Sequence, residues 1–332
     1  MNNVIEISDL TVVYPSGGRR LFAGEKLTAV DNVTLSVEEG VSLGIAGESG
    51  SGKSTLVKAA GNLLKFGNPG VNITGKIFLN TDGKKHDILN IPGGKMKELR
   101  KHVQFIFQDP NSSLNPRLTV GEIIEEPLRY FSACGKTERK EKALKLLGMT
   151  GLEEDLYSRY PHELSGGQKQ RIGIARALAP EPKVLIADEP LSSLDVSVQA
   201  QIIGLFKKLK DEFNLTLIFV SHDLSVVENL CNEVAVMYLG KILEQGKCSA
   251  VLSSPKNPYT KALISSVPVP EYRAERKERT VLQGDIPSPV NRPAGCVFCT
   301  RCPVAADLCF KTPPDLQPLE DGRLSACHFT QS

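Results

Sequence analysis

The chain has 332 residues, of which 41% are hydrophobic and 23% are charged. This composition excludes global disorder and indicates a globular protein of one large or two modest domains. The 40 Lys and Arg residues barely exceed the 38 Asp and Glu residues, so the overall charge favours neither nucleic acid nor anionic lipid as a partner. No apolar run approaches the roughly 20 residues that span a bilayer, and the first residues lack the basic and hydrophobic regions of a signal peptide. We therefore expect a cytosolic location.

Short aliphatic runs alternate with segments of helical periodicity along the first 255 residues. The aliphatic runs are bounded by polar or glycine-containing turns and predict buried parallel strands at residues 41–47, 102–108, 183–189 and 215–221. Helical segments span residues 53–64, 168–179 and 198–212. This alternation predicts an α/β fold. The almost entirely helix-forming stretch from about 116 to 180 predicts a helical subdomain inserted into it.

The composition changes after residue 255. A charge run at residues 272–280 and a proline-rich stretch at residues 286–295 are typical of a linker. A cysteine-dense tail follows, and its prolines exclude long helices. We therefore predict an α/β domain over residues 1–255 and a small C-terminal extension over residues 256–332.

The segment GESGSGKST lies between a predicted strand and a predicted helix. It matches the phosphate-loop pattern G-x-x-x-x-G-K-[ST] in the context that the pattern requires. Its glycines let backbone N–H groups turn toward phosphate oxygens, Lys53 is expected to reach the β- and γ-phosphates, and the Ser54 hydroxyl to coordinate Mg²⁺. A glycine-rich surface turn is the alternative. The residues expected to bind ATP here are Gly47, Ser49, Gly50, Ser51, Gly52, Lys53, Ser54 and Thr55.

A second strand, in KVLIADEP, runs directly into two carboxylates, Asp188 and Glu189. Such charges at the end of a buried strand are costly unless they meet a cation. Asp188 is the expected Mg²⁺ partner, usually through water. Glu189 is placed to polarise the attacking water. An ordinary strand end with exposed acids is the alternative.

The motif LSGGQ, Leu164–Gln168, forms a second glycine-rich anion nest before a predicted helix. With the phosphate loop and the paired acids, it makes the sequence resemble an ATP-binding cassette (ABC) ATPase of the transporter superfamily. The resemblance implies a head-to-tail dimer that sandwiches two nucleotides. In that dimer Ser165, Gly166 and Gly167 contact the nucleotide held by the other subunit.

The same resemblance assigns roles to further residues. Gln108 matches the glutamine that links Mg²⁺ and water to the helical subdomain, Asp195 lies in the loop that crosses between subunits, and His222 matches the switch histidine. Tyr14 fits the aromatic residue that stacks on adenine, with an inserted segment after it. From the residues alone, His222 could instead cap the helix that begins near Asp223, and Tyr14 could be a surface tyrosine on an edge strand.

Longer matches extend the resemblance over nearly the whole chain. Segments such as QDPNSSLNPRLTVGEIIEEPL and NPYTKALISSVP are similar to the ATP-binding subunits of dipeptide and oligopeptide transporters. This implies a peripheral protein on the cytoplasmic face of the cell membrane. Its implied partners are a paralogous ATPase subunit or a second copy, two transmembrane permease subunits and an extracytoplasmic peptide-binding protein. Nickel and glutathione importers share this ATPase design, and soluble ABC ATPases that act on ribosomes or DNA share the cassette, so both classes are alternatives.

Five of the eight cysteines fall within one short stretch of the tail. The subfamily pattern selects Cys296, Cys302, Cys309 and Cys327 as a four-thiolate set, with Cys299 as a possible substitute. The C-x2-C-x2-C spacing around Cys299 is similar to that of ferredoxin cluster loops. We therefore expect a metal-bound extension with a [4Fe–4S] cluster, zinc and reduced free thiols being the alternatives.

Overall fold

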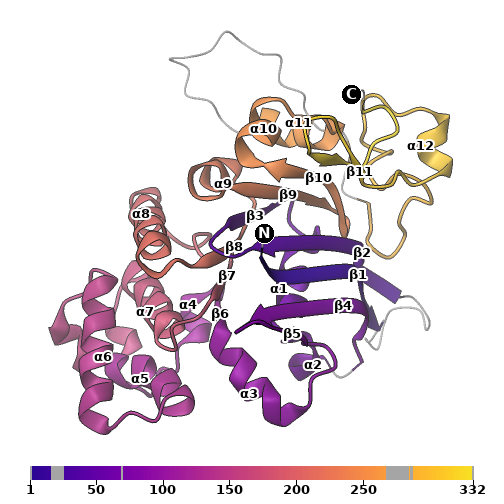
Figure 1. Cartoon of the computed structure of the whole chain (residues 1–332). Helices are drawn as coiled ribbons and strands as arrows, with labels where there is room; N and C mark the ends of the chain where they lie inside the picture. The colour runs from indigo at the N-terminus through magenta and orange to yellow at the C-terminus, as the bar shows by residue number, and fades with distance from the viewer. Residues whose placement is uncertain (1, 16–25, 69, 267–283, 285–286, 331–332) are drawn as a thin grey trace. The chain divides into compact units, whose positions relative to one another are not determined.

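The computed structural model describes residues 2–15, 26–68, 70–266, 284 and 287–330, and Figure 1 labels its helices and strands. The chain forms two compact units. Unit 1 comprises Met1–Val4, Val37–Val41 and Phe78–Val220, and unit 2 comprises Ile5–Ser36, Ser42–Ile77 and Ser221–Ser332. Among the described residues, no helix combines the length and apolarity needed to cross a membrane.

Unit 2 contains the strand that leads into the phosphate loop. This strand, β3 (Ser42–Ala46), pairs in parallel with β9 (Glu233–Tyr238), and β9 pairs antiparallel with β10 (Lys241–Lys247). Every residue of β3 is buried, as expected of a strand covered on both faces. Short strands β11 (Gln317–Pro318) and β12 (Leu324–Ser325) extend this part of the sheet in the order β11-β12-β10-β9-β3.

A second sheet uses long strands from the N-terminal part of the chain. In it β1 (Asn3–Pro15) lies between β2 (Lys26–Glu38) and β4 (Asn72–Thr81). In β1 the buried positions Ile5 and Ile7 are two residues apart, and the alternation then shifts by one residue at Asp9, whose φ is 51°, so that Leu10 and Val12 are buried next. This shift keeps the apolar residues after Asp9 buried. The helices of unit 2 are α1 (Lys53–Ala60), α2 (Leu64–Gly67), α9 (Leu224–Leu230), α10 (Cys248–Ser253), α11 (Pro258–Ser265) and α12 (Asp307–Lys311).

Unit 1 contains three parallel strands, in the order β8-β7-β6. They are β6 (Val103–Ile106), β7 (Val184–Asp188) and β8 (Thr216–Ser221), and all residues of β7 and β8 are buried. Strand β5 (Lys84–Asp87) pairs antiparallel with the end of β4. Helices α3 (Gly93–His102) and α8 (Val196–Phe213) also belong to this unit.

The stretch between β6 and β7 is helical. It contains α4 (Pro110–Ser113), α5 (Val120–Phe131), α6 (Lys136–Met149), the 3-10 turns Glu154–Ser158 and Pro161–Glu163, and α7 (Gly166–Leu178). Helices α5, α6 and α7 pack against one another (Figure 1). Thr119 starts α5 with a capping box, in which its hydroxyl accepts the Glu122 N–H and the Glu122 carboxylate accepts the Thr119 N–H.

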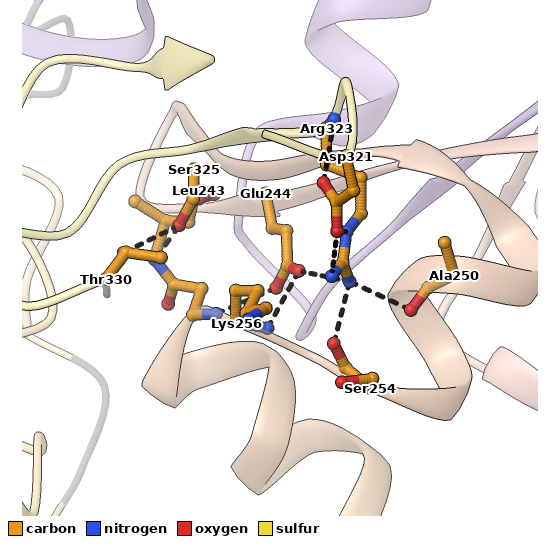
Figure 2. A network of polar contacts seen from close by, with 10 residues as sticks. Leu243, Glu244, Ala250, Ser254, Lys256, Asp321, Arg323, Ser325 and Thr330 are labelled. Carbon is orange, nitrogen blue, oxygen red and sulfur yellow. Dashed lines mark hydrogen bonds and ion pairs between the residues drawn. The ribbon is translucent and has the colours of Figure 1, made fainter. Parts of the chain in front are cut away.

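Two features attach the C-terminal residues to β10. Strand β12 pairs with β10, and a buried polar network connects the two segments (Figure 2). The Glu244 side chain is completely buried, and Arg323 lies 3.6 Å from its carboxylate. Arg323 also donates to the carbonyl oxygens of Ala250 and Ser254 at 2.8 and 2.7 Å. A buried carboxylate needs such partners because leaving it unpaired would be costly.

The structure confirms the four predicted strands, although three of the four residues of β6 are half-buried rather than buried, and it corrects two further details. The helix expected over residues 53–64 ends at Ala60, because Gly61 follows and Asn62 has a left-handed φ of 53°. The strand arrangement is mixed rather than purely parallel, since β10 and β12 run antiparallel to their neighbours. Residues 267–283 and 285–286, which include the charge run of the predicted linker, lie outside the described residues.

Candidate active site

The phosphate loop turns sharply between β3 and α1, and two glycines make the turn possible. Gly47 and Gly52 have φ values of 150° and 102°. A Cβ at Gly47 would lie 2.1 Å from the carbonyl oxygen of Met237, and one at Gly52 would lie 2.2 Å from that of Ala29. No larger residue fits either position, so the glycine spacing of the motif follows from the path of the backbone.

The polar groups of the loop are arranged to receive an anion. Lys53 is only 3% exposed, and its ammonium group donates to the carbonyl oxygens of Gly47 and Glu48 at 2.8 and 2.9 Å. The Ser51 hydroxyl is buried and has no hydrogen-bond partner within the described chain. Because an unsatisfied buried hydroxyl is unfavourable, this position fits a phosphate oxygen. Ser54 and Thr55 lie half-buried in the first turn of α1, and Ser49 and Gly50 are exposed.

Glu48, which sequence reasoning did not single out, connects the loop to the C-terminal extension. Its carboxylate accepts two hydrogen bonds from the Arg301 guanidinium, at 2.6 and 3.1 Å. Its backbone N–H donates to the Tyr259 hydroxyl at 2.9 Å. The hydrogen bond to Glu48 raises the pKa of Arg301, which stays charged. No local pattern predicts this contact, because its two residues lie far apart in the sequence.

In unit 1, the acids predicted from KVLIADEP lie at the end of β7. Asp188 is 2% exposed. Glu189 follows it with a left-handed φ of 45°, and its N–H donates to the Val220 carbonyl oxygen at 3.1 Å. The Gln108 side chain donates to the Glu189 carboxylate at 3.2 Å. The structure thus brings together two residues that were predicted separately, and the strained backbone at Glu189 is typical of a functional position.

The LSGGQ motif forms the N-terminus of α7. The Ser165 hydroxyl accepts the Gln168 N–H at 3.3 Å, and the Gln168 side chain accepts the Ser165 N–H at 2.9 Å, which completes a capping box. A Cβ at Gly167 would lie 2.8 Å from the Val198 side chain, whereas Gly166 is more open. The motif therefore presents an exposed, capped helix N-terminus, a suitable contact for an anion.

The other predicted residues lie on loops and strand ends. Asp195 is exposed at the start of α8. His222 is exposed after β8, and the helix that follows is capped by the Asp223 carboxylate, which accepts the Ser225 N–H at 2.8 Å. His222 is therefore not the cap. Tyr14 lies half-buried near the end of β1. The phosphate loop, Tyr14 and His222 belong to unit 2, whereas Gln108, the LSGGQ motif, the paired acids and Asp195 belong to unit 1.

The five cysteines of the extension line one small cavity of about 20 Å³, together with Phe298 and Phe329. The expected metal site is not shown, because no three Cys, His, Asp or Glu side chains among the described residues are arranged to hold an ion. All five are free thiols. Burial raises the pKa of Cys296 to about 11 and also raises the pKa of Cys299 and Cys302, which favours their protonated thiol forms. Thiol side chains are nevertheless the type of ligand that a soft metal prefers, and all five cysteines line the same cavity.

Comparisons with known proteins agree with these features. The ABC transporter family model matches residues 30–192, and the model of the oligopeptide/dipeptide transporter C-terminal region matches residues 243–309. The oligopeptide transport ATP-binding protein AppF of Bacillus subtilis is 46% identical over 98% of this chain and 97% of its own length. The oligopeptide transport ATP-binding protein OppF of Salmonella typhimurium is 46% identical over 95% of this chain and 92% of its own length.

Solved structures show the same fold. The ATP-binding cassette MJ0796, solved as a dimer in a post-hydrolysis state with ADP and Pi, matches with a TM-score of 0.63 and 33% identity. The match covers 74% of this chain and 98% of that one. The α/β cassette predicted from the sequence is thereby confirmed. The chain belongs to the ATP-binding subunits of the ABC transporter family, in the branch with the oligopeptide/dipeptide C-terminal region, and is an ABC ATPase.

Proposed function

We propose that this ABC ATPase drives the uptake of dipeptides and oligopeptides through an importer in the cytoplasmic membrane. The observation that carries the proposal is 46% identity, over nearly the whole chain, to two relatives named as oligopeptide transport ATP-binding proteins. The match to the C-terminal region of that branch supports it independently of the cassette. In this proposal residues 1–255 form the cassette, with the helical subdomain at about 116–180, and residues 256–332 form the extension.

The phosphate loop would bind ATP, with Lys53 moving from its carbonyl partners to the β- and γ-phosphates. Ser51 would satisfy its buried hydroxyl on a phosphate oxygen, and Tyr14 would stack on adenine. Ser54, Gln108 and Asp188 would hold Mg²⁺, which supplies positive charge for phosphoryl transfer. Glu189 would orient and deprotonate water while Gln108 holds its carboxylate, and His222 would stabilise charge on the γ-phosphoryl group.

Hydrolysis would require two cassettes. Ser165, Gly166 and Gly167, with Asp195, would close over the nucleotide of a second copy or of a paralogous subunit. The dimeric state of the similar cassette MJ0796 supports this arrangement. Closure excludes water and assembles the reacting groups, so transport and hydrolysis are coupled. Two permease subunits and an extracytoplasmic peptide-binding protein would complete the importer, with this chain held peripherally on its cytoplasmic face.

The cargo can be tested in vesicles that contain the whole importer. ATP hydrolysis inside the vesicles and uptake of labelled peptide should both rise when the loaded peptide-binding protein is added outside. A Lys53→Ala variant should lose both activities. Nickel or glutathione uptake without peptide uptake would contradict the proposed cargo and leave the ATPase assignment intact.

We further propose that the cysteine cavity holds a [4Fe–4S] cluster on Cys296, Cys302, Cys309 and Cys327, with Cys299 as a substitute ligand. The shared cavity and the soft sulfur donors support this site. Iron and acid-labile sulfide should be found in equal amounts after anaerobic purification. One zinc per chain with no brown absorbance would instead assign the cavity to zinc.

A further inference from the structure

The phosphate loop of this chain is held at one residue by two segments of the C-terminal region. Glu48 is the second residue of the loop, and nothing in phosphoryl transfer requires a carboxylate there. Arg301 makes a bidentate ion pair with the Glu48 carboxylate, and the Tyr259 hydroxyl accepts a hydrogen bond from the Glu48 backbone N–H. Bidentate arginine–carboxylate pairs fix geometry as well as charge, so both the side chain and the backbone of Glu48 are constrained.

Glu48 also contacts Lys53, the residue proposed to bind phosphate. The Glu48 carbonyl oxygen accepts a hydrogen bond from Lys53 at 2.9 Å and another from the Ser51 N–H at 3.2 Å. Moving Glu48 therefore moves an acceptor of the phosphate-binding lysine. Arg301 contacts Glu48, and Glu48 in turn contacts Lys53.

Arg301 is positioned by the part of the extension that carries the cysteines. It directly precedes Cys302, and its N–H donates to the Phe298 carbonyl oxygen at 3.0 Å. The Phe298 ring lines the cysteine cavity and packs against Tyr259 and Tyr238, with ring centroids 5.2 and 5.4 Å apart. A continuous set of buried aromatic contacts thus joins the cavity to the partners of Glu48.

The Arg301 side chain of this ion pair is buried, at 6% exposed, and the Glu48 side chain is 22% exposed. Buried ion pairs add little to stability, because desolvation offsets much of their attraction. A role in holding one conformation of the loop accounts better for this pair than a role in stability does.

We propose that Arg301 is a positioning residue for nucleotide binding, which makes the ATP affinity of the phosphate loop depend on the folded, cysteine-lined extension. The proposal rests on the proposed function of the loop in binding ATP. By reciprocity, bound nucleotide must stabilise the extension as much as the extension favours nucleotide.

The test uses the full chain and equilibrium binding of a fluorescent ATP analogue with Mg²⁺. Arg301→Ala and Glu48→Gln should each weaken binding about tenfold, within the range typical of coupling between sites. The double variant should bind no more weakly than the worse single variant, because both remove the same contact. Arg301→Lys should recover part of the loss, and Lys311→Ala, which removes an exposed charge from the same extension, should bind like the wild type.

Two further readouts separate positioning from general destabilisation. In steady-state ATPase assays Arg301→Ala should raise KM with kcat within about twofold, as expected when ground-state and transition-state binding are lost equally. Hydrogen exchange of residues 296–302 should slow when nucleotide binds the wild type, and this slowing should vanish in Arg301→Ala. Glu48→Gln leaves the extension sequence intact, so it carries the test if Arg301→Ala disturbs folding.

The possible failures are distinguishable. A wild-type chain that binds no nucleotide would contradict the proposed ATP site itself. A wild type that binds, with Arg301→Ala and Glu48→Gln both within twofold of it, would overturn only the role of Arg301. Additive losses in the double variant would also overturn it, since they would show that the two residues act independently.

Discussion

At the scale of single residues, the left-handed backbone at Glu189 aims a carboxylate that a regular strand end would direct elsewhere. The conformation is held by a hydrogen bond from its N–H to Val220, while Gln108 contacts its side chain. A non-glycine residue at this φ costs about 1–3 kcal/mol. The surrounding structure maintains that strain where catalysis is expected to need one orientation of the acid.

Replacing Glu189 by Gln keeps the shape and removes the base. We expect ATP binding to be retained, turnover to fall about 10²–10⁴-fold, and a nucleotide-bound dimer to accumulate, as measured by phosphate release and size-exclusion chromatography with MgATP. Glu181→Gln is the matched control, because Glu181 is an exposed acid with a similar φ of 55°. Wild-type turnover in Glu189→Gln would remove Glu189 from its proposed role.

His102 gives unit 1 a dependence on pH. Burial lowers its pKa below the ordinary 6.5, despite Asp82 nearby. The folded state therefore resists protonation, so this contribution to stability is complete above pH 6.5 and is lost as the pH falls through the lower folded-state pKa. Urea unfolding at pH 7.5 and 5.5 should show a smaller loss for His102→Gln than for the wild type. Equal losses would show that other groups govern the acid sensitivity.

At the scale of elements, the helical stretch is organised around one buried carboxylate on α5. Glu125 is 6% exposed, accepts a short hydrogen bond from the Tyr157 hydroxyl and lies 3.3 Å from Arg129. Burial and this hydrogen bond raise the pKa of Tyr157 to about 12. Gly121 makes room for the tyrosine ring, because a Cβ there would lie 2.4 Å from it.

Tyr157→Phe keeps the ring and removes one partner of Glu125. We expect the free energy of unfolding to fall by about 1–2 kcal/mol, the typical cost of weakening a buried polar contact, measured by urea denaturation. Tyr130→Phe provides the comparison, because Tyr130 is 51% exposed. An equal effect of both changes would contradict a special role for the Tyr157 hydroxyl.

The elements themselves could be predicted well from local pattern. Strands β3, β6, β7 and β8 are short aliphatic runs between turns, and the phosphate loop and LSGGQ nest each have a fixed spacing. The left-handed backbone at Asp9 could not be predicted, since a left-handed Asp leaves no distinctive local pattern. The link between Glu48 and Arg301 was missed because it depends on tertiary folding that brings the extension to the loop. The cysteines were predicted to share a site, and they line one cavity, but sulfur spacing alone could not say whether they converge on an ion.

At the scale of the molecule, the extension belongs to the same compact unit as the phosphate loop. Arg323 is central to its attachment, because within the part of the chain that the structure describes it is the cation beside the buried Glu244 carboxylate, which also accepts the backbone N–H groups of Lys256 and Asn257 at 2.9 and 3.0 Å. Asn257 adds a bridge, donating to the carbonyl oxygens of Leu243 and Ala326. The extension is thus joined to the cassette by strand pairing and by charge.

Arg323→Met should destabilise the chain by about 3 kcal/mol, because it leaves a buried carboxylate without its cation. The change should appear as faster proteolysis of residues 287–330 and a lower Tm. Adding Glu244→Gln should restore part of the loss, whereas Asp321→Asn should matter little, since the Asp321 side chain is 44% exposed. No rescue in the double variant would show that Arg323 acts through its backbone contacts alone.

The pairing of β12 with β10 also bears on how the subunit is made. Strand β10 emerges from the ribosome long before the residues that pair with its outer edge. Until those residues arrive, the nascent chain exposes unpaired backbone groups on β10, the kind of edge on which misassembly begins. Chaperone occupancy during translation should therefore persist until β12 has emerged from the ribosome.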